Sequence, residues 1–214
     1  MTLLLHSYWR ATAPYRVRIG LNLKGVAYDY APVHLVEGVQ HSEGYKAINR
    51  QELIPALTTP EGRVITQSLA ILEWLEETHP EPALLPKDPA DRALVRAMAA
   101  IVACDIHPLN NLRVQQQLTA LGVDAAGRDV WSKRWINDGF AALEPMVTAH
   151  GRGFAFGASP TLADCCLIPQ VYSAHRYGVW LDPYPAIAGV AQRAAEHPAF
   201  AAAHPDRQPD AQPA

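Results

Sequence analysis

The pattern of apolar residues changes near residue 80, and this change limits the folds open to the chain. Residues 3–78 alternate short β-like runs with helical stretches in the order β-α-β-α-β-β-α. Residues 80–89 contain four prolines and no hydrophobic period, which indicates a linker. From residue 91 the pattern is helical and rich in alanine. The sequence therefore predicts an α/β domain at 1–80, a linker at 81–90 and an all-helical domain at 91–214.

The expected elements follow from local periodicity and from turn-forming residues. Strands are expected at 3–8, 26–35, 56–59 and 63–65, and helices at 14–23, 45–48 and 68–78. In the second domain, helices are expected at 91–118, 126–149, 161–177 and 185–196, the first of them kinked at Pro108. Thr161 and Asp164 have the spacing of a capping box. The tail from His204 is expected to fray.

Composition excludes several classes of protein. Of the 214 residues, 49% are hydrophobic and 18% are charged, which is typical of a folded globular chain. Lys and Arg number 18 against 21 Asp and Glu, a net charge of −3, so we expect no nucleic-acid partner and no anionic membrane surface as partner. The longest apolar run, 97–104, is too short to span a membrane, and the N-terminus lacks the pattern of a signal peptide. We expect a cytoplasmic protein.

Neither histidine nor cysteine predicts a metal site. The nine histidines are scattered and have no zinc-ligand spacing with a carboxylate, so we expect no metal. Cys165 and Cys166 are adjacent within a predicted helix and are expected to be buried, unreactive thiols.

Several segments resemble the zeta class of cytosolic glutathione transferases. They are YWRATAPYRVRIGLNLKG at 8–25, Ile54-Pro55, Thr66-Gln67-Ser68, CDIHPLNNLR at 104–113, the capping box and PQVYSAHRYGVWLDPYP at 169–185. The resemblance implies a thioredoxin-like α/β domain followed by an all-α domain, glutathione as cofactor and a homodimer. It also implies glutathione-dependent cis–trans isomerisation of a maleyl keto acid, either maleylacetoacetate or maleylpyruvate, in which the thiolate adds to the double bond and is later expelled.

The thiolate site is expected at the turn that begins the first helix, where open backbone N–H groups and the helix dipole favour an anion. The family pattern here is Ser-Ser-Cys-Ser or Ser-Ser-Ala-Ser, whereas this chain has Ala11, Thr12, Ala13 and Pro14. Thr12 is therefore our candidate for the hydroxyl that stabilises the thiolate, and helix capping is its alternative role. Because Ala13 replaces the cysteine of dehalogenating relatives, reductive dehalogenation is disfavoured.

The resemblance also assigns residues to the dicarboxylate and to glutathione. Arg10 and Arg176 correspond to arginines that line the substrate site in similar enzymes. Guanidinium groups suit carboxylates, which is the chemistry that a dicarboxylate substrate requires. Arg113 is a weaker third candidate. Arg16 and Arg18 are expected to be salt-bridged structural residues. The other glutathione-site candidates are Ala11, Ala13, Gln40, His41, Ile54, Pro55, Gln67, Ser68, Asp105, His107, Asn110 and Asn111. Within this set Pro55 corresponds to a cis-proline, and Asp105 is expected to reach the glutathione of a partner subunit.

Two other functions remain open on the sequence. The chain could be a general glutathione conjugase that uses Thr12, or a non-catalytic glutathione-binding protein that lost activity with the serine at position 11.

Overall fold

The computed structural model describes residues 2–212, which divide into two compact units. The first unit includes the described residues up to Leu84 and those from His197 onward, and the second runs from Leu85 to Glu196. The division after Leu84 lies within the linker expected at 81–90. The assignment of residues 197–212 differs from the expectation, because they group with the first unit and not with the helical domain.

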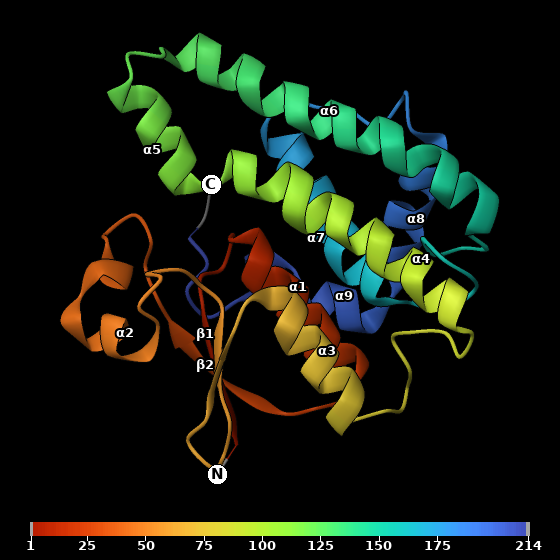
Figure 1. Cartoon of the computed structure of the whole chain (residues 1–214), viewed down its shortest axis with the longest axis horizontal. Coiled ribbons are helices and arrows are strands. Elements are labelled where there is room, and N and C mark those ends of the chain that lie inside the picture. The colour runs from red at the N-terminus through yellow and green to blue at the C-terminus, as the bar shows by residue number, and fades with distance from the viewer. Residues whose placement is uncertain (1, 213–214) are drawn as a thin grey trace. The chain divides into compact units, whose positions relative to one another are not determined.

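The first unit is built on a mixed sheet with strand order β2-β1-β3-β4. Its elements are β1 (Leu3–Ser7), α1 (Thr12–Leu23), β2 (Tyr28–Pro32), η1 (Val39–His41), α2 (Glu43–Ile48), β3 (Ala56–Thr58), β4 (Val64–Thr66) and α3 (Ser68–Thr78). Strand β2 pairs parallel to β1, whereas β3 is antiparallel to both β1 and β4. In Figure 1, α1 and α3 cover one face of this sheet and α2 lies beyond the other. The predicted order of elements is confirmed.

The first helix ends where the sequence indicates, at a glycine in the left-handed region. Gly25 has φ +65°, and the N–H groups of Gly25 and Val26 donate to the carbonyls of Asn22 and Leu21 at 3.1 and 3.0 Å. Gly20 lets α1 approach α3, because a Cβ at this position would lie 2.3 Å from Leu72 Cδ2. The two helices therefore pack closely against each other.

The C-terminal segment is ordered and does not fray as expected. Helix α9 (Pro198–Ala203) packs against α1, and a 3₁₀ turn η4 (Pro205–Arg207) follows. Gln208 is buried, and its side-chain amide donates to the carbonyls of Ala202 and His204 at 3.0 and 2.8 Å. The tail is therefore part of the first unit.

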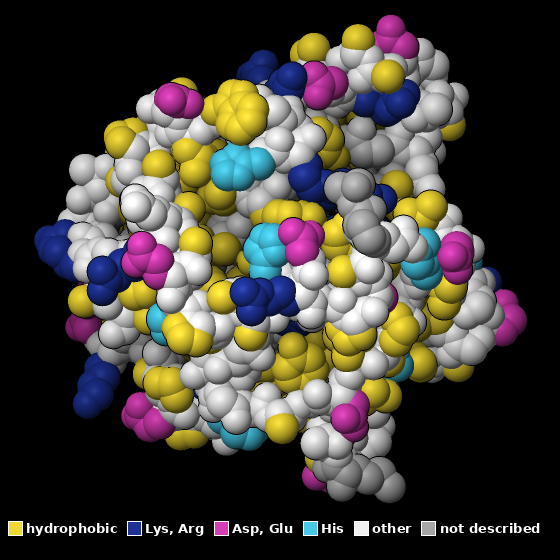
Figure 2. All heavy atoms as spheres, turned by 180° about the vertical axis from the view of Figure 1, so that it is seen from behind, with side chains coloured by type: hydrophobic (Ala, Val, Ile, Leu, Met, Phe, Trp, Pro, Cys, Tyr) yellow, Lys and Arg dark blue, Asp and Glu magenta, His cyan; other side chains and the backbone are white. Residues whose placement is uncertain are grey.

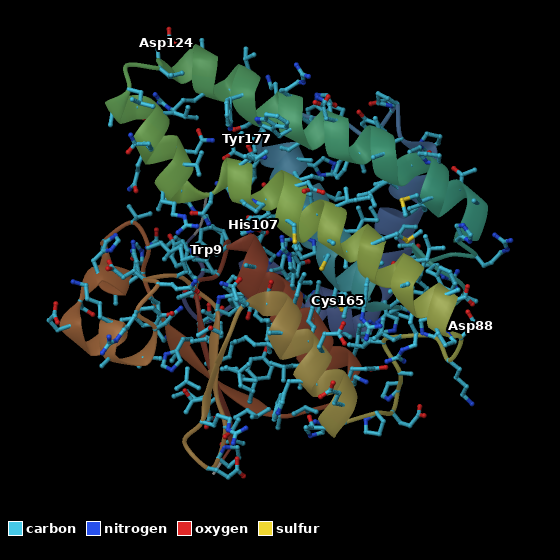
Figure 3. All side chains as sticks on the ribbon, in the orientation of Figure 1. Trp9, Asp88, His107, Asp124, Cys165 and Tyr177 are labelled. Carbon is cyan, nitrogen blue, oxygen red and sulfur yellow. The ribbon has the colours of Figure 1, made fainter. Side chains whose placement is uncertain are left out.

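The second unit is helical throughout its described elements. They are α4 (Pro89–Ala100), the π-helical segment η2 (Ile101–Ile106), the 3₁₀ segment η3 (His107–Asn110), α5 (Leu112–Ala120), α6 (Ala125–His150), α7 (Leu162–Arg176) and α8 (Pro185–Glu196). Asp88 and Asp124 cap α4 and α6, whose N-terminal ends Figure 3 marks. The expectation of a single kinked helix at 91–118 is wrong, because the chain is extended at Asn111, with ψ 148°.

One described stretch, Pro89–Ala120, could cross a membrane by length and composition only. Its apolar window is only 28% buried, although Val95, Met98 and Val102 are buried side chains. The chain is extended at Asn111 within this stretch, and a single stretch of this kind is weak evidence for a span. On the face shown in Figure 2, basic and acidic side chains are interspersed and form no continuous basic band.

The capping box at the start of α7 is confirmed. The Thr161 backbone N–H and hydroxyl both donate to Asp164 Oδ2, at 2.8 and 2.9 Å, and the Asp164 N–H donates to the Thr161 carbonyl. The other oxygen, Oδ1, accepts from the Ala155 N–H at 2.7 Å. Burial raises the pKa of Asp164 to about 6, and these hydrogen bonds oppose the rise.

Candidate active site

Three segments expected to bind glutathione emerge at one edge of the sheet in the first unit. His6, Ala56 and Thr66 lie in one row across β1, β3 and β4. This row marks the edge at which β1 ends, β3 begins and β4 ends. Beyond it lie the turn after β1, the residues before β3 and the start of α3. The register therefore brings Arg10–Ala13, Ile54–Pro55 and Gln67–Ser68 to the same edge, although they are far apart in the sequence.

The turn between β1 and α1 presents the N-terminus of the helix. The Ala11 N–H donates to the Tyr8 carbonyl at 3.1 Å, and Ala11 is the N-cap, without a side-chain cap. Thr12 is the first helical residue and is buried, so the alternative in which its hydroxyl caps the helix is wrong. Intrahelical bonding begins with the Tyr15 N–H, which leaves the N–H groups of Thr12 and Ala13 outside the helical ladder.

Arg10 lies at the third position of that turn as a half-buried cation. Its guanidinium carbon is 5.6 Å from the ring centroid of Trp9 and 6.0 Å from that of Tyr8. Figure 3 marks Trp9 at the start of α1. Within residues 2–212 no carboxylate forms an ion pair with Arg10, so its charge is available to an anion beside the N-terminus of α1.

The expected cis-proline is confirmed, since the Ile54–Pro55 bond is cis. Pro55 is buried immediately before β3. The carbonyl of Leu53 accepts hydrogen bonds from the Asn49 amide and the Tyr45 hydroxyl, both at 2.7 Å. These contacts tie the segment before Ile54 to α2 and hold its backbone at the sheet edge.

The start of α3 carries Gln67 in a left-handed conformation, with φ +69°. The side-chain amide of Gln67 donates to Gln51 Oε1 at 2.8 Å. Ser68 is buried, and its hydroxyl oxygen accepts from Arg16 Nη1 at 3.2 Å. The Ser68 hydroxyl therefore lies next to a cation at a helix N-terminus, an arrangement that suits a carboxylate.

Gln40 and His41 lie in η1 and contact each other. Gln40 Nε2 is 3.0 Å from His41 Nε2, and Nδ1 of the same ring is hydrogen-bonded to the Glu52 carboxylate. That hydrogen bond lowers the pKa of Glu52. Gln40 is buried, and its Oε1 has no partner among the described residues. A buried amide oxygen of this kind calls for a donor, which a ligand amide would supply.

The remaining candidates belong to the second unit, where the long-helix segment breaks. Asp105 is exposed on η2, and His107 begins η3, at the position marked in Figure 3. The Asn110 side-chain amide donates to the Ile106 carbonyl at 3.3 Å. The Asn111 side chain caps α5 by accepting from the Arg113 N–H at 3.2 Å, so Asn111 has a structural role.

Arg113 and Arg176 are both exposed, and they lie on different helices. Arg113 and His107 do not lie on one continuous helix, because the extended residue Asn111 separates η3 from α5. Arg176 is the last residue of α7, with its guanidinium carbon 6.0 Å from the Tyr172 ring centroid. Within residues 2–212 no group of three or more His, Cys, Asp or Glu side chains could hold a metal ion.

The sequence did not indicate the residues that support the Arg10 turn. Arg18 was expected to form a salt bridge, but its guanidinium donates to the Ser7 hydroxyl and to the carbonyls of Trp9 and Ala203. Asp210 accepts from the Trp9 N–H. These contacts join residues distant in sequence, so no local pattern could have revealed them.

The first unit fits glutathione on its own geometry. Glutathione carries a thiol, two carboxylates, an amine and two peptide groups. The sheet edge offers open helix N–H groups and the Ser68 hydroxyl beside Arg16, and η1 offers the buried Gln40 oxygen. Donors therefore match the anionic groups, and an acceptor matches the peptide N–H groups.

Comparisons with known proteins agree with this geometry. The family model of the glutathione S-transferase N-terminal domain matches residues 13–78, and the family model of the glutathione S-transferase C-terminal domain matches residues 129–193. The chain is 49% identical to a maleylpyruvate isomerase of Ralstonia sp. (96% of this chain, 98% of the relative) and 48% identical to a maleylacetoacetate isomerase of Pseudomonas aeruginosa (96% and 97%).

Solved structures give the same result. A holo maleylpyruvate isomerase described as a bacterial zeta-class glutathione S-transferase superposes with a TM-score of 0.94 at 46% identity, over 98% of this chain and all of the other. A maleylacetoacetate isomerase of Anaeromyxobacter dehalogenans with bound glutathione superposes with a TM-score of 0.90 at 46% identity, over 99% and 98%. The chain therefore belongs to the zeta class of glutathione transferases, in the family that includes the maleylacetoacetate and maleylpyruvate isomerases.

Proposed function

We propose that the protein catalyses the glutathione-dependent cis–trans isomerisation of a maleyl keto acid, either maleylacetoacetate or maleylpyruvate. The observation that carries the proposal is the sheet edge of the first unit, where Arg10 and the open N–H groups of α1 lie in one turn. The likeness to both named isomerases supports it, because each relative aligns over nearly the whole chain. A further relative was solved with dicarboxyethyl glutathione and citrate bound, which are ligands of the expected charge.

Some residues of the turn stabilise the sulfur of glutathione, and Arg10 binds the substrate. When bound, glutathione supplies a thiolate that adds to the carbon–carbon double bond and later leaves it, so rotation can occur between the two events. The N–H groups of Thr12 and Ala13, together with the Thr12 hydroxyl, donate toward the sulfur and lower the pKa of its thiol from the ordinary value near 8.5. Arg10 holds a substrate carboxylate through charge-assisted hydrogen bonds.

The glutathione backbone is held by the rest of the edge. Ile54 offers its backbone to the cysteinyl residue in the manner of an added strand, and cis Pro55 sets the direction of that backbone. Gln67 and Ser68 hold the γ-glutamyl carboxylate, whereas Gln40 and His41 serve the glycyl end. In the second unit, Asp105, His107, Asn110, Arg113 and Arg176 are proposed to contribute polar groups to ligand binding.

We further propose that the protein is a cytoplasmic homodimer without a nucleic-acid or membrane partner and that it acts in aromatic amino acid breakdown. The exposed carboxylate of Asp105 supports a contact with glutathione bound to a partner subunit. Light scattering after size-exclusion chromatography measures the oligomeric state. A monomer under assay conditions would remove this role of Asp105.

The experiment that tests the function follows maleylacetoacetate and maleylpyruvate by ultraviolet absorbance, with and without glutathione. We expect conversion to the fumaryl isomers only with glutathione, and the rates rank the two substrates. Turnover of a chloronitrobenzene at a comparable rate would favour a general conjugase. Glutathione binding without turnover of any of these compounds would favour a binding protein.

The Arg10→Ala variant tests whether the turn before α1 takes part in the reaction. Loss of a charge-assisted hydrogen bond costs about 1.5–3 kcal/mol, so we expect kcat/KM for the dicarboxylate to fall at least tenfold. Arg63→Ala is the matched control, because Arg63 is exposed next to the opposite end of β4. Equal kinetics for the Arg10 variant and the wild-type protein would remove Arg10 from the site.

A further inference from the structure

The turn that presents Arg10 is held through two consecutive peptide groups. The Trp9 N–H donates to Asp210 Oδ2 at 3.1 Å, and the Trp9 carbonyl accepts from Arg18 Nη2 at 2.8 Å. Trp9 is the second residue of the turn that the Ala11 N–H closes onto the Tyr8 carbonyl. Asp210 and Arg18 therefore fix the backbone on both sides of the Trp9 Cα, directly before Arg10.

The two side chains that hold Trp9 are themselves anchored in the first unit. Arg18 is fully buried, and its Nη1 donates to the Ser7 hydroxyl at 3.1 Å while its Nε donates to the Ala203 carbonyl at 3.0 Å. Asp210 Oδ1 accepts from the Tyr30 hydroxyl at 2.6 Å. The network thus links β1, β2 and the C-terminal segment to the turn.

Each oxygen of Asp210 has a separate partner. Burial raises the pKa of Tyr30, and the hydrogen bond to Asp210 raises it further, so the phenol remains a donor across the neutral range. The Trp9 N–H has no helical acceptor because it precedes α1. Removal of the carboxylate would leave the partly buried Trp9 N–H without its acceptor, would remove the hydrogen bond from the Tyr30 hydroxyl and would release the backbone before Arg10.

We propose that Asp210 is a positioning residue that, through Trp9, sets the placement of Arg10 and of the N-terminus of α1. The inference rests on the proposed function, since the groups so placed are those assigned to the carboxylate and the thiolate. Small displacements of reacting groups are costly, because catalysis depends on their alignment to within a fraction of an ångström. Asp210 acts through the backbone of Trp9 and not by contact with either ligand.

Three variants test the role. Asp210→Ala removes both contacts, whereas Asp210→Asn keeps an oxygen for the Trp9 N–H and offers its amide to the Tyr30 oxygen. Asp206→Ala is the control, because Asp206 lies in the same tail with a side chain that is 72% exposed and forms an ion pair with His204 at 3.6 Å. Each protein is measured by ultraviolet titration of the thiol of bound glutathione, by kcat and KM, and by amide exchange at residues 8–13.

In Asp210→Ala we expect the pKa of the bound thiol to rise toward its ordinary value, with a roughly tenfold lower thiolate fraction at neutral pH. We expect kcat/KM to fall about tenfold and the amides of residues 8–13 to exchange faster. Asp210→Asn should restore most of the thiolate fraction and the rate. Asp206→Ala should match the wild-type protein in all three measurements.

A purely structural role predicts a different result. It would lower the thermal midpoint of Asp210→Ala and leave the thiol pKa and the kinetics of the folded protein unchanged, and that outcome overturns the proposal. Equal effects of Asp206→Ala and Asp210→Ala also overturn it. If the wild-type protein binds glutathione but isomerises neither keto acid, the proposed function fails, and the thiol titration and amide exchange still decide the role of Asp210.

Discussion

Lys24 and Glu76 form an ion pair inside the first unit, with Lys24 Nζ 2.5 Å from Glu76 Oε2. The Lys24 side chain is fully buried at the end of α1, and that of Glu76 is 8% exposed near the end of α3. The same Glu76 oxygen accepts from the Leu84 N–H at 2.8 Å. One carboxylate therefore joins two helices to the last residue before the second unit.

Glu76→Ala should destabilise the protein strongly, because it leaves a buried ammonium without its carboxylate. We expect the free energy of unfolding to fall by about 3–5 kcal/mol, measured by equilibrium urea denaturation. Glu43→Ala is the matched control, since its pair with Lys46 is exposed, and we expect it to leave the midpoint unchanged. Similar midpoints for the two variants would show that burial gives the Lys24–Glu76 pair no special weight.

Gly139→Ala should disturb the contact between α6 and the π-helical segment. A Cβ at Gly139 would lie 2.2 Å from Ile106 Cδ1, and Ile106 is itself fully buried. We expect a loss of about 1–3 kcal/mol in the free energy of unfolding. Gly189→Ala, in α8, places its Cβ in open space and should stabilise the protein by up to about 1 kcal/mol. A neutral Gly139→Ala would mean that Ile106 repacks freely.

Asp164 should make stability depend on pH in the acid range. Its pKa in the folded protein is about 6, whereas the ordinary pKa of an aspartic acid side chain is 3.8, so between these values the folded state binds more protons than the unfolded state. The stability due to its protonated form is fully present below about pH 4 and is lost as the pH rises through about 6. Two pKa units correspond to roughly 3 kcal/mol.

Urea unfolding of the wild-type protein and of Asp164→Asn, compared at each pH, isolates this carboxyl from the others. We expect the stability of the wild-type protein relative to the variant to decline between pH 4 and pH 6.5. A difference that stays constant over this range would show that Asp164 titrates alike in both states.

Ala11→Ser should restore a hydroxyl at the N-cap of α1. The N-cap now lacks a side-chain hydrogen bond, and Pro14 provides no N–H, so a serine oxygen would accept from Ala13 alone. We expect a gain of about 0.5–1 kcal/mol in the unfolding free energy of the ligand-free protein, in which the sulfur does not engage the Ala13 N–H. When glutathione is bound, that N–H donates to the sulfur and the serine hydroxyl is a further donor, so we expect a lower pKa for the thiol. Thr12→Ala should raise that pKa while glutathione affinity holds. Unchanged titrations in both variants would exclude side-chain hydroxyls from thiolate stabilisation.

Local patterns in the sequence were sufficient for much of the first unit. Gly25 ends α1 where expected, and the resemblance placed the cis bond at Pro55 correctly. Each of these features depends on residues adjacent in the chain. The resemblance grouped Arg10, Pro55 and Ser68 in one site, but their convergence at one edge depends on the strand order and register, which the sequence did not predict.

Features set by tertiary contacts were not predictable from the sequence. Pro108 signalled a kink, but the complete break at Asn111 depends on packing, including the hydrogen bond from Trp131 Nε1 to the Leu109 carbonyl at 2.8 Å. The tail has a polar, proline-rich composition that is typical of disorder. It is ordered because Asp210 reaches Trp9, a residue 201 positions earlier.

The grouping of residues 197–212 with the first unit means that this unit is discontinuous, and the second unit is an insertion between its two parts. During synthesis the ribosome must complete the whole helical unit before α9 and Asp210 become available. Until then the guanidinium of Arg18 lacks the Ala203 carbonyl, and the Tyr30 hydroxyl lacks its acceptor. The helical unit can therefore fold first, and the glutathione-binding edge is completed last, although most of its residues are made first.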